Sequence, residues 1–276
     1  MGRIIQNRES VHPGTYIGKG KIEEVRALVY AMDATGIICD DELSPAQLNN
    51  LERELDCKVM DRTLLILDIF AARAITSEGK IQVELAQLRY RSARLVGLRE
   101  SLSRLGGGIG TRGPGEKKLE TDRRLIRTRI SALKQELSQV EKHRELIRSG
   151  RARGNMKTVA IVGYTNAGKS TLLNTLSGAD ALAENKLFAT LDPLTRRAEL
   201  NGQEVLLTDT VGFVQKLPHE LVDAFRSTLE EAVHADLLLH VVDASHKEKE
   251  RQMEVVDEVL HQLHDHNIPR ILVYNK

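Results

Sequence analysis

The segment from Gly163 to Ser170 reads GYTNAGKS and matches the phosphate-binding pattern G-x-x-x-x-G-K-[ST], the P-loop, without interruption. Glycines at its two ends let the backbone fold closely around phosphate oxygens, where a side chain would clash. Backbone N–H groups of the loop and the amino terminus of a following helix supply positive potential for a polyanion. We expect Lys169 to reach the β- and γ-phosphates and the Ser170 hydroxyl to bind Mg²⁺.

The flanking residues provide the context that a P-loop requires. Residues 157–162 (KTVAIV) are apolar and β-branched, which indicates a buried parallel strand. Residues 170–177 (STLLNTLS) predict a helix whose leucines face a core and which stops at Gly178. A chance glycine turn is the alternative, and this strand–loop–helix context makes it the weaker one.

A second motif, Asp209-Thr-Val-Gly212, follows about forty residues later at the end of an expected strand. The Asp209 carboxylate is placed to hold Mg²⁺ through water, and the Gly212 N–H to contact a γ-phosphate. Many GTPases have a glutamine after this glycine that orients the attacking water, whereas this chain has Phe213. We therefore expect slow intrinsic hydrolysis that a partner stimulates; simple packing of Phe213 is compatible with the same conclusion.

The last residues, Asn275 and Lys276, follow an apolar strand and begin the N-K-x-D pattern that reads guanine. The aspartate of that pattern would lie beyond Lys276. We expect weakened guanine selectivity and a marginal nucleotide domain for the chain as written. An ATP-binding protein is disfavoured by this context and stays formally open.

The middle of the chain is strongly basic. Residues 89–153 hold 18 Lys and Arg against 7 Asp and Glu, a local net charge of +11 in a chain whose formal net charge is +1. Such a block favours a polyanionic partner, with nucleic acid the first candidate. A solvated helical surface explains the charge equally well, so charge alone leaves both interpretations open.

The same region predicts two long helices, over 81–148, around a glycine-rich loop. The second helix carries apolar residues mostly at spacings of four and three, which is typical of a coiled-coil seam. The seam suits an antiparallel hairpin; it could close within one chain or between two, and we expect a monomer. The loop 106–115 reads GGGIGTRGPG, and with Arg112, Lys117 and Lys118 it suits insertion into a polyanionic site. A plain linker is the alternative.

We expect an α/β protein in three parts. Residues 1–80 form a small α/β unit with a parallel sheet, in which residues 3–6 could be a strand, and residues 81–153 form the helical hairpin. Residues 154–276 form a doubly wound P-loop domain that binds its ligand at the carboxyl ends of the strands. The expected helices are 21–33, 44–55, 63–74 and 249–266, and the further expected strands are 36–39, 58–60, 197–200, 204–207, 237–242 and 270–274.

Composition excludes several classes of protein. No run approaches the roughly 18 apolar residues of a membrane span. The first ten residues lack the apolar core of a signal peptide. Two cysteines in apolar settings, Cys39 and Cys57, without metal-ligand spacing, indicate a reducing compartment, and we expect a cytoplasmic protein.

The chain resembles the HflX family of ribosome-associated GTPases, of the translation-factor class. The resemblance covers nearly the whole chain, and a glycine-rich segment joined to this P-loop is far more specific than either alone. The motifs that carry it are GGGIGTRGPGEKKLETDRR (106–124), GYTNAGKSTLLN (163–174), FATLDPLTRR (188–197) and DTVGF (209–213), supported by TYIGKGK (15–21), DELSPAQ (41–47) and DRTLLILDIFAARA (61–74).

The resemblance implies that Thr190 is the switch threonine, whose hydroxyl and backbone engage Mg²⁺ and the γ-phosphate. It also implies that the N-terminal part docks on the large ribosomal subunit, with the glycine loop reaching ribosomal RNA near the peptidyl-transferase centre. Family members are thought to rescue or split stalled ribosomes. Relative to the family, we expect the chain to lack the start of its N-terminal domain and everything after Lys276.

Together these patterns predict a Mg²⁺-dependent GTPase that binds GTP and GDP. Lys169, Thr190 and Gly212 carry the catalytic roles, and Ser170 and Thr190 bind the metal, with Asp209 acting through water. A non-catalytic fragment that binds RNA or ribosomes is the alternative from another class. The predicted nucleotide-binding residues are Gly163, Tyr164, Thr165, Asn166, Ala167, Gly168, Lys169, Ser170, Thr171, Phe188, Ala189, Thr190, Leu191, Asp192, Asp209, Thr210, Val211, Gly212, Asn275 and Lys276.

Overall fold

The computed structural model describes residues 2–7, 9–105, 114–153, 156–178, 192–215, 226–262 and 268–276. It divides into two compact units, one made of Met1–Asp68 with Gln87–Ala132 and the other of Ile69–Ala86 with Leu133–Lys276. Within the described ranges, no helix is both long and apolar enough to cross a membrane.

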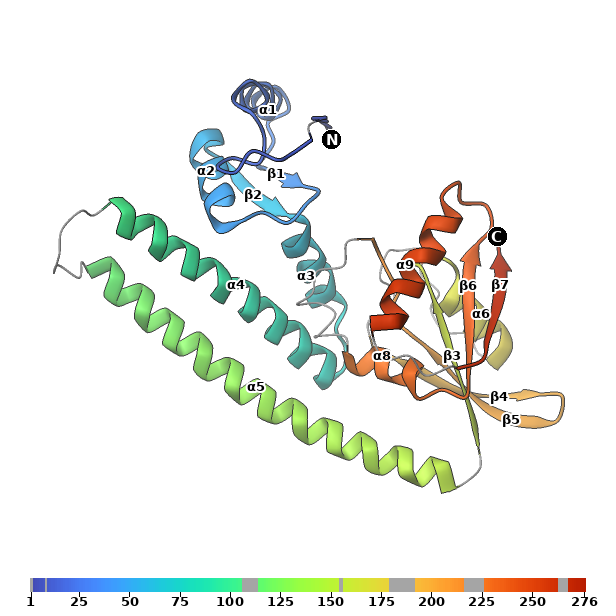
Figure 1. Ribbon diagram of the computed structural model, residues 1–276. Helices are drawn as coiled ribbons and strands as arrows, with labels where there is room; N and C mark the ends of the chain where they lie inside the picture. The colour runs from blue at the N-terminus through green and yellow to red at the C-terminus, as the bar shows by residue number, and fades with distance from the viewer. Residues whose placement is uncertain are drawn as a thin grey trace. The chain divides into compact units, whose positions relative to one another are not determined.

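The first unit is built around a two-stranded parallel sheet of β1 (Gly36–Cys39) and β2 (Lys58–Asp61). Helices α1 (Lys19–Ala31) and α2 (Pro45–Leu55) pack with it, and α3 (Arg62–Arg73) follows β2 directly (Figure 1). The expected α/β unit with a parallel sheet is therefore confirmed. Its buried core consists of Ile22, Val25, Cys39, Leu43, Leu51, Leu55 and Val59.

The suggestion of a strand over residues 3–6 is wrong. Among the described residues these four join no ladder, and the sheet next to them contains β1 and β2. Ile4 instead packs against the core through its side chain, and the Gln6 side-chain oxygen accepts the Gly18 N–H at 3.0 Å. A short apolar run becomes a strand only where a neighbouring strand accepts its backbone hydrogen bonds.

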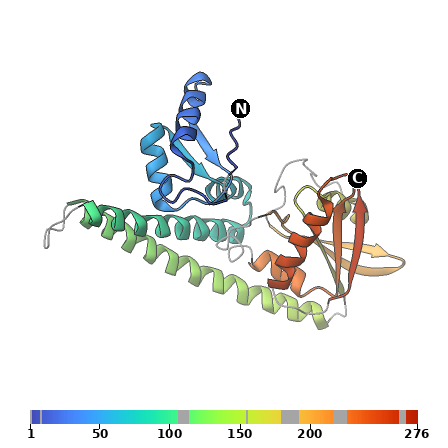
Figure 2. The ribbon, with the colours of Figure 1, turned by 45° about the horizontal axis from the view of Figure 1, so that its top comes forward.

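Two long helices, α4 (Ser77–Leu105) and α5 (Pro114–Arg153), form the expected hairpin. Their segments lie side by side within each unit (Figures 1 and 2). Helix α5 begins at Pro114, so the last two residues of the expected loop 106–115 are helical; proline is favoured at a first helical position because its missing N–H is not needed there. Residues 106–113 lie outside the described residues.

The second unit contains a five-stranded sheet in the order β4-β5-β3-β6-β7. Strand β4 is antiparallel to β5, and the other neighbours are parallel, so the expected doubly wound domain is confirmed. The strands are β3 (Lys157–Gly163), β4 (Leu194–Leu200), β5 (Gln203–Asp209), β6 (Leu237–Asp243) and β7 (Arg270–Asn275). The β4–β5 hairpin turns at Asn201 and Gly202, which both have positive φ, as a tight type I′ turn requires.

Helices cover both faces of this sheet. Helix α6 (Lys169–Ser177) packs on one face, with Leu173 fully buried against Val159, Ile161, Leu207 and Val241. Helices α8 (Arg226–Val233) and α9 (Lys249–Gln262) lie on the other face (Figure 1). The parallel strands β3, β5 and β6 end at one edge of the sheet, and this edge holds the candidate site.

Candidate functional site

The P-loop connects β3 to α6, as the pattern predicts. Gly168 is the N-cap of α6 and has φ 98°, a backbone conformation that an L side chain rarely adopts. Because Gly168 has no side chain, it does not cap the first turn of α6 with a side-chain hydrogen bond. The N–H groups of that turn therefore point into the loop, where a phosphate group would bind.

Lys169 lies inside the loop rather than on the surface. Its relative exposure is 6%, and its Nζ donates a hydrogen bond to the Tyr164 carbonyl oxygen at 3.1 Å. Burial lowers the pKa of Lys169 to about 8, and the nearby Asp209 carboxylate opposes that shift. An ammonium group held with so little solvent is a strong partner for an incoming phosphate anion.

Ser170 and Asp209 meet at the edge of the sheet. The Ser170 Oγ donates to Asp209 Oδ2 at 2.6 Å, and Asp209 is fully buried at the end of β5, beside Ile161 of β3. A hydroxyl and a carboxylate oxygen at this spacing are the hard ligands that Mg²⁺ prefers, and Mg²⁺ completes its shell with water and substrate phosphates. Among the described residues there is no cluster of three or more His, Cys, Asp and Glu that would suit an all-protein metal site.

The DTVG segment is tied to the P-loop by backbone hydrogen bonds. The Phe213 N–H donates to the Gly163 carbonyl at 3.1 Å, and the Thr165 N–H donates to the Phe213 carbonyl at 2.7 Å. A Cβ on Gly212 would lie 2.7 Å from the Thr165 Cα and 3.1 Å from the Lys169 Nζ, so only glycine fits this close approach. The Phe213 side chain is 1% exposed and packs in the interior, and its ring has no polar group that could orient an attacking water.

The two C-terminal residues also reach the P-loop. The Asn275 side-chain amide donates to the Ala167 carbonyl at 2.9 Å, and the Lys276 Nζ donates to the Asn166 carbonyl at 2.6 Å. Lys276 also pairs with Asp243 at 3.3 Å. The structure thus brings the Asn-Lys pair to the loop that would hold the phosphates.

Sequence reasoning missed Asp243, which ends β6 at the same edge as Asp209 ends β5. Hydrogen bonds from the Ser245 hydroxyl and N–H hold its pKa below the usual range, against the effect of burial, and Lys276 adds to the shift. A signal was available, because Asp243 terminates an apolar strand just as Asp209 does. Tyr164 has a further contact that the pattern did not indicate: its hydroxyl oxygen accepts the Gln215 N–H at 3.2 Å.

Several predicted residues are not in this cluster. Residues 188–191, which include Thr190, and Arg112 lie outside the described residues. Lys117 and Lys118 lie in the first turns of α5, and the structure does not describe their side chains. The carboxylate of Asp192 contacts Ile75 and Thr76, at the start of α4.

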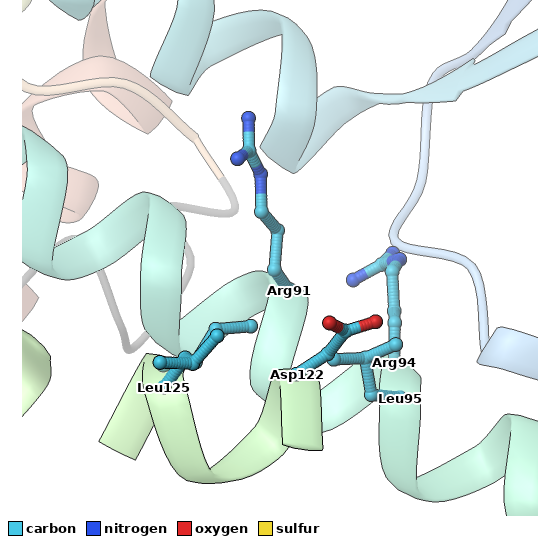
Figure 3. A pocket seen from close by; sticks show the side chains of 6 residues that line it. Arg91, Arg94, Leu95, Asp122 and Leu125 are labelled. Carbon is cyan, nitrogen blue, oxygen red and sulfur yellow. The ribbon is translucent and has the colours of Figure 1, made fainter. Parts of the chain in front are cut away.

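The first unit contains a separate hollow of about 480 Å³ between α4 and α5. Figure 3 shows Arg91, Arg94 and Asp122 around an apolar floor that includes Leu95 and Leu125. Arg94 is already engaged, because its guanidinium pairs with Asp61 and stacks 3.4 Å over the Tyr90 ring. This hollow contributes no residue to the phosphate-binding cluster.

Comparisons with known proteins agree with this geometry. Three family models together match nearly the whole chain: the GTP-binding GTPase N-terminal region over residues 1–71, the GTP-binding GTPase middle region over 73–151, and the 50S ribosome-binding GTPase over 158–276. Among solved structures, the crystal structure of the SsGBP and GDP complex is similar, with 28% identity and a TM-score of 0.54. That alignment covers 98% of this chain and 73% of SsGBP.

Two curated relatives, both called GTPase HflX, come from Lacrimispora saccharolytica and Caldanaerobacter subterraneus. They are 66% and 57% identical to this chain over 277 residues, and each alignment covers 100% of it. The chain spans 66% and 65% of their lengths, just under two thirds. The resemblance that the motifs indicated is confirmed: the chain belongs to the HflX family of GTPases.

Proposed function

We propose that this chain binds GTP together with Mg²⁺, hydrolyses the γ-phosphate and acts on the large ribosomal subunit. The observation that carries the nucleotide part is the 2.6 Å pair of Ser170 and Asp209, set beside the buried Lys169. A cation, a metal-ligating hydroxyl and a strand-end carboxylate converge there on one loop. This set is what phosphoryl transfer to water needs, because catalysis of that reaction is mostly positioning and charge stabilisation.

Each residue has a role that follows from its place. The N–H groups of the P-loop and of the first turn of α6 hold the β-phosphate, and the Lys169 ammonium stabilises charge that develops on the β–γ bridge. Ser170 and, through water, Asp209 would hold Mg²⁺, which would neutralise phosphate charge. The Gly212 N–H contacts the γ-phosphate, and Thr190 completes the metal and γ-phosphate contacts, as the family resemblance implies.

Base recognition is proposed for Asn275 and Lys276. Their hydrogen bonds to the carbonyls of Ala167 and Asn166 support this role, because they join the base-reading segment to the phosphate loop. SsGBP, a similar protein, was crystallised with GDP. We therefore propose guanine nucleotides as the ligands.

The ribosomal role is also a proposal. The family description of residues 158–276 as a 50S ribosome-binding GTPase and the basic block over 89–153 both support it. We propose that Arg112, Lys117 and Lys118 contact ribosomal RNA, that the chain works as a cytoplasmic monomer, and that it helps to rescue or split stalled ribosomes. We also propose that residues 1–80, 81–153 and 154–276 are the functional domains.

Calorimetric titration of the 276-residue chain tests the nucleotide part. GDP and GTP should bind in the presence of Mg²⁺, and Ser170→Ala should weaken the Mg²⁺ dependence of binding while Thr175→Ala, on the exposed side of the same helix, should not. Binding of ATP as tightly as GTP would support the P-loop and contradict the guanine assignment. No binding of either nucleotide would contradict the proposal.

A further inference from the structure

We propose that Thr76 and Asp192 are positioning residues for GTP hydrolysis, an inference that rests on the proposed function. Together they form a latch, defined here as the contacts of the Asp192 carboxylate with Ile75 and Thr76. The latch ties the start of β4 to the first turn of α4. Through β4 it fixes the sheet edge beside Asp209.

The latch is a dense set of hydrogen bonds on one carboxylate. Asp192 Oδ2 accepts the N–H groups of Ile75 and Thr76, each at 3.0 Å, and Oδ1 accepts the Thr76 hydroxyl. The Thr76 Oγ1 in turn accepts the Gly79 N–H at 3.0 Å, which makes Thr76 the N-cap of α4. Hydrogen bonds to an ionised acceptor are roughly twice as strong as neutral ones.

The sequence of α4 leaves room for this carboxylate. A Cβ on Gly79 would collide with Asp192 Oδ1. The Asp192 carboxylate can therefore lie against the first turn of α4 only because residue 79 is a glycine. Glycine in a helix interior is otherwise unfavourable, by about 1 kcal/mol relative to alanine. The amino terminus of α4, a helix of 29 residues, also favours a negative charge. Packing, capping and charge therefore all fit the same contact.

The latch lies two residues from the metal-binding edge of the sheet. Pro193, whose ring fixes its φ, separates Asp192 from Leu194, the first residue of β4. Leu194 pairs directly with Asp209, and the hydroxyls of the neighbouring pair, Thr195 and Thr208, lie 2.9 Å apart. A displacement of Asp192 therefore moves Leu194, the strand partner of Asp209, which lies two residues further along the chain.

The other end of the latch is also anchored. Glu78, in the first turn of α4, pairs with Arg144 of α5 at 2.9 Å, and both side chains are mostly buried. The base of the helical hairpin is thus joined to the sheet by charged contacts. A movement of the first turn of α4 would therefore displace β4 more directly than the P-loop, because β3 and α6 hold the P-loop separately.

This placement predicts a specific kinetic signature. Loss of the latch should lower kcat for GTP by roughly tenfold or more, because small misplacements of catalytic groups cost up to about 100-fold in rate. The KM for GTP and the affinity for GDP should change by less than about twofold, because the P-loop contacts stay intact. A purely structural role would instead lower kcat, raise the KM for GTP and lower the affinity for GDP together.

The experiment uses the 276-residue chain, four single variants and the double variant Asp192→Ala with Thr76→Val. Asp192→Ala and Thr76→Val break the latch, whereas Thr76→Ser keeps the hydroxyl and should restore kcat to near the wild-type value. Asp236→Asn is the matched control, because the Asp236 carboxylate also accepts a backbone N–H and a threonine hydroxyl, from Thr158, at 2.8 and 3.0 Å. It lies at the amino-terminal end of β6, away from the phosphate edge, and should leave kcat unchanged.

The latch is supported if Asp192→Ala and Thr76→Val lose kcat alone, the double variant loses no more than either single one, and Thr76→Ser recovers it. Wild-type kcat in Asp192→Ala, or a parallel loss of GDP affinity in Asp192→Ala and Thr76→Val, would overturn it. The wild-type arm separates the two claims: a wild-type chain that binds GDP and turns over GTP keeps the proposed function whatever the variants do. A wild-type chain without turnover overturns both.

Discussion

Gly168 joins the two halves of the nucleotide site. It caps α6 with φ 98°, and a Cβ at this position would collide with the Asn275 side-chain amide. Replacing Gly168 with alanine therefore both strains the backbone and displaces Asn275, for which we propose base recognition. Strain of this kind costs on the order of 1 to 3 kcal/mol.

We predict that Gly168→Ala weakens GDP binding at least about tenfold, a loss of roughly 1.4 kcal/mol. Isothermal titration measures it. Gly178→Ala is the matched control: Gly178 ends the same helix with φ 62°, and, its chain neighbours aside, no atom of the described residues would lie within 4 Å of a Cβ there. That variant should lose about 1 kcal/mol of stability and keep its GDP affinity. Equal GDP affinity in both variants would contradict the role of Gly168.

The buried Lys169 predicts a pH dependence of nucleotide affinity. Its pKa is about 8 without nucleotide, and a bound phosphate raises that pKa because it stabilises the charged form. The bound complex therefore holds a proton that the free protein loses above pH 8. Affinity for GDP should be full below pH 8 and fall by about tenfold per pH unit above it, with net proton uptake on binding. Titrations at pH 7.5 and 9.5 check this, and equal affinities would contradict it.

At the scale of residues, the sequence predicted those site residues that belong to a short local motif. Lys169, Ser170, Asp209 and Gly212 converge in space because the P-loop and the DTVG segment end neighbouring strands. The Asp192 latch was not predictable, because its partners are more than a hundred residues away in sequence. Nothing in the motif FATLDPLTRR distinguishes an aspartate that faces a nucleotide from one that caps a helix.

At the scale of elements, the interior strand β6 carries a buried histidine. His240 is 1% exposed, and among the described residues its Nδ1 has no hydrogen-bond partner. Burial lowers its pKa to about 4, and the nearby Arg270 adds to the shift while Asp257 opposes it. The unfolded chain takes up a proton at pH 6.5 that the folded chain resists, so stability falls as pH drops from 6.5 toward 4.

We predict that His240→Leu removes on the order of 2 kcal/mol of the stability lost between pH 6.5 and pH 5. Urea unfolding at the two pH values, followed by circular dichroism, measures the difference. The exposed His234, changed to leucine, serves as the control and should leave the acid dependence as in the wild type. An identical acid dependence in all three proteins would rule out His240 as its source.

Most elements were predictable because their patterns are local. The capping box of Ser44 and Gln47 starts α2, and a continuous apolar run marks the buried strand β3. Helix α8 was missed, although Leu229 and Ala232 are buried in it at helical spacing, because eight residues hold only about two turns of that pattern. Residues 3–6 show the opposite error, since an apolar run without a strand partner stays irregular.

At the scale of the molecule, the sequence predicted the class of each sheet. The hairpin was predictable from its apolar seam, and Leu133 of α5 is fully buried as that seam requires. The hairpin helices also pass from one compact unit to the other, which sequence patterns do not reveal. The reason is that a helix of 40 residues has one local pattern but packs against different neighbours along its length.

The central claim is that the P-loop, the DTVG segment and a ribosomal partner act together in one GTPase. Steady-state GTP hydrolysis by the 276-residue chain, with and without purified large ribosomal subunits, tests it most directly, with Lys169→Ala as the inactive reference. Because Phe213 is buried and orients no water, we predict slow turnover alone and at least about tenfold stimulation by the subunits, both abolished in Lys169→Ala. Ribosome binding that is indifferent to nucleotide, with no hydrolysis above the Lys169→Ala background, would contradict the account and favour a non-catalytic ribosome-binding protein.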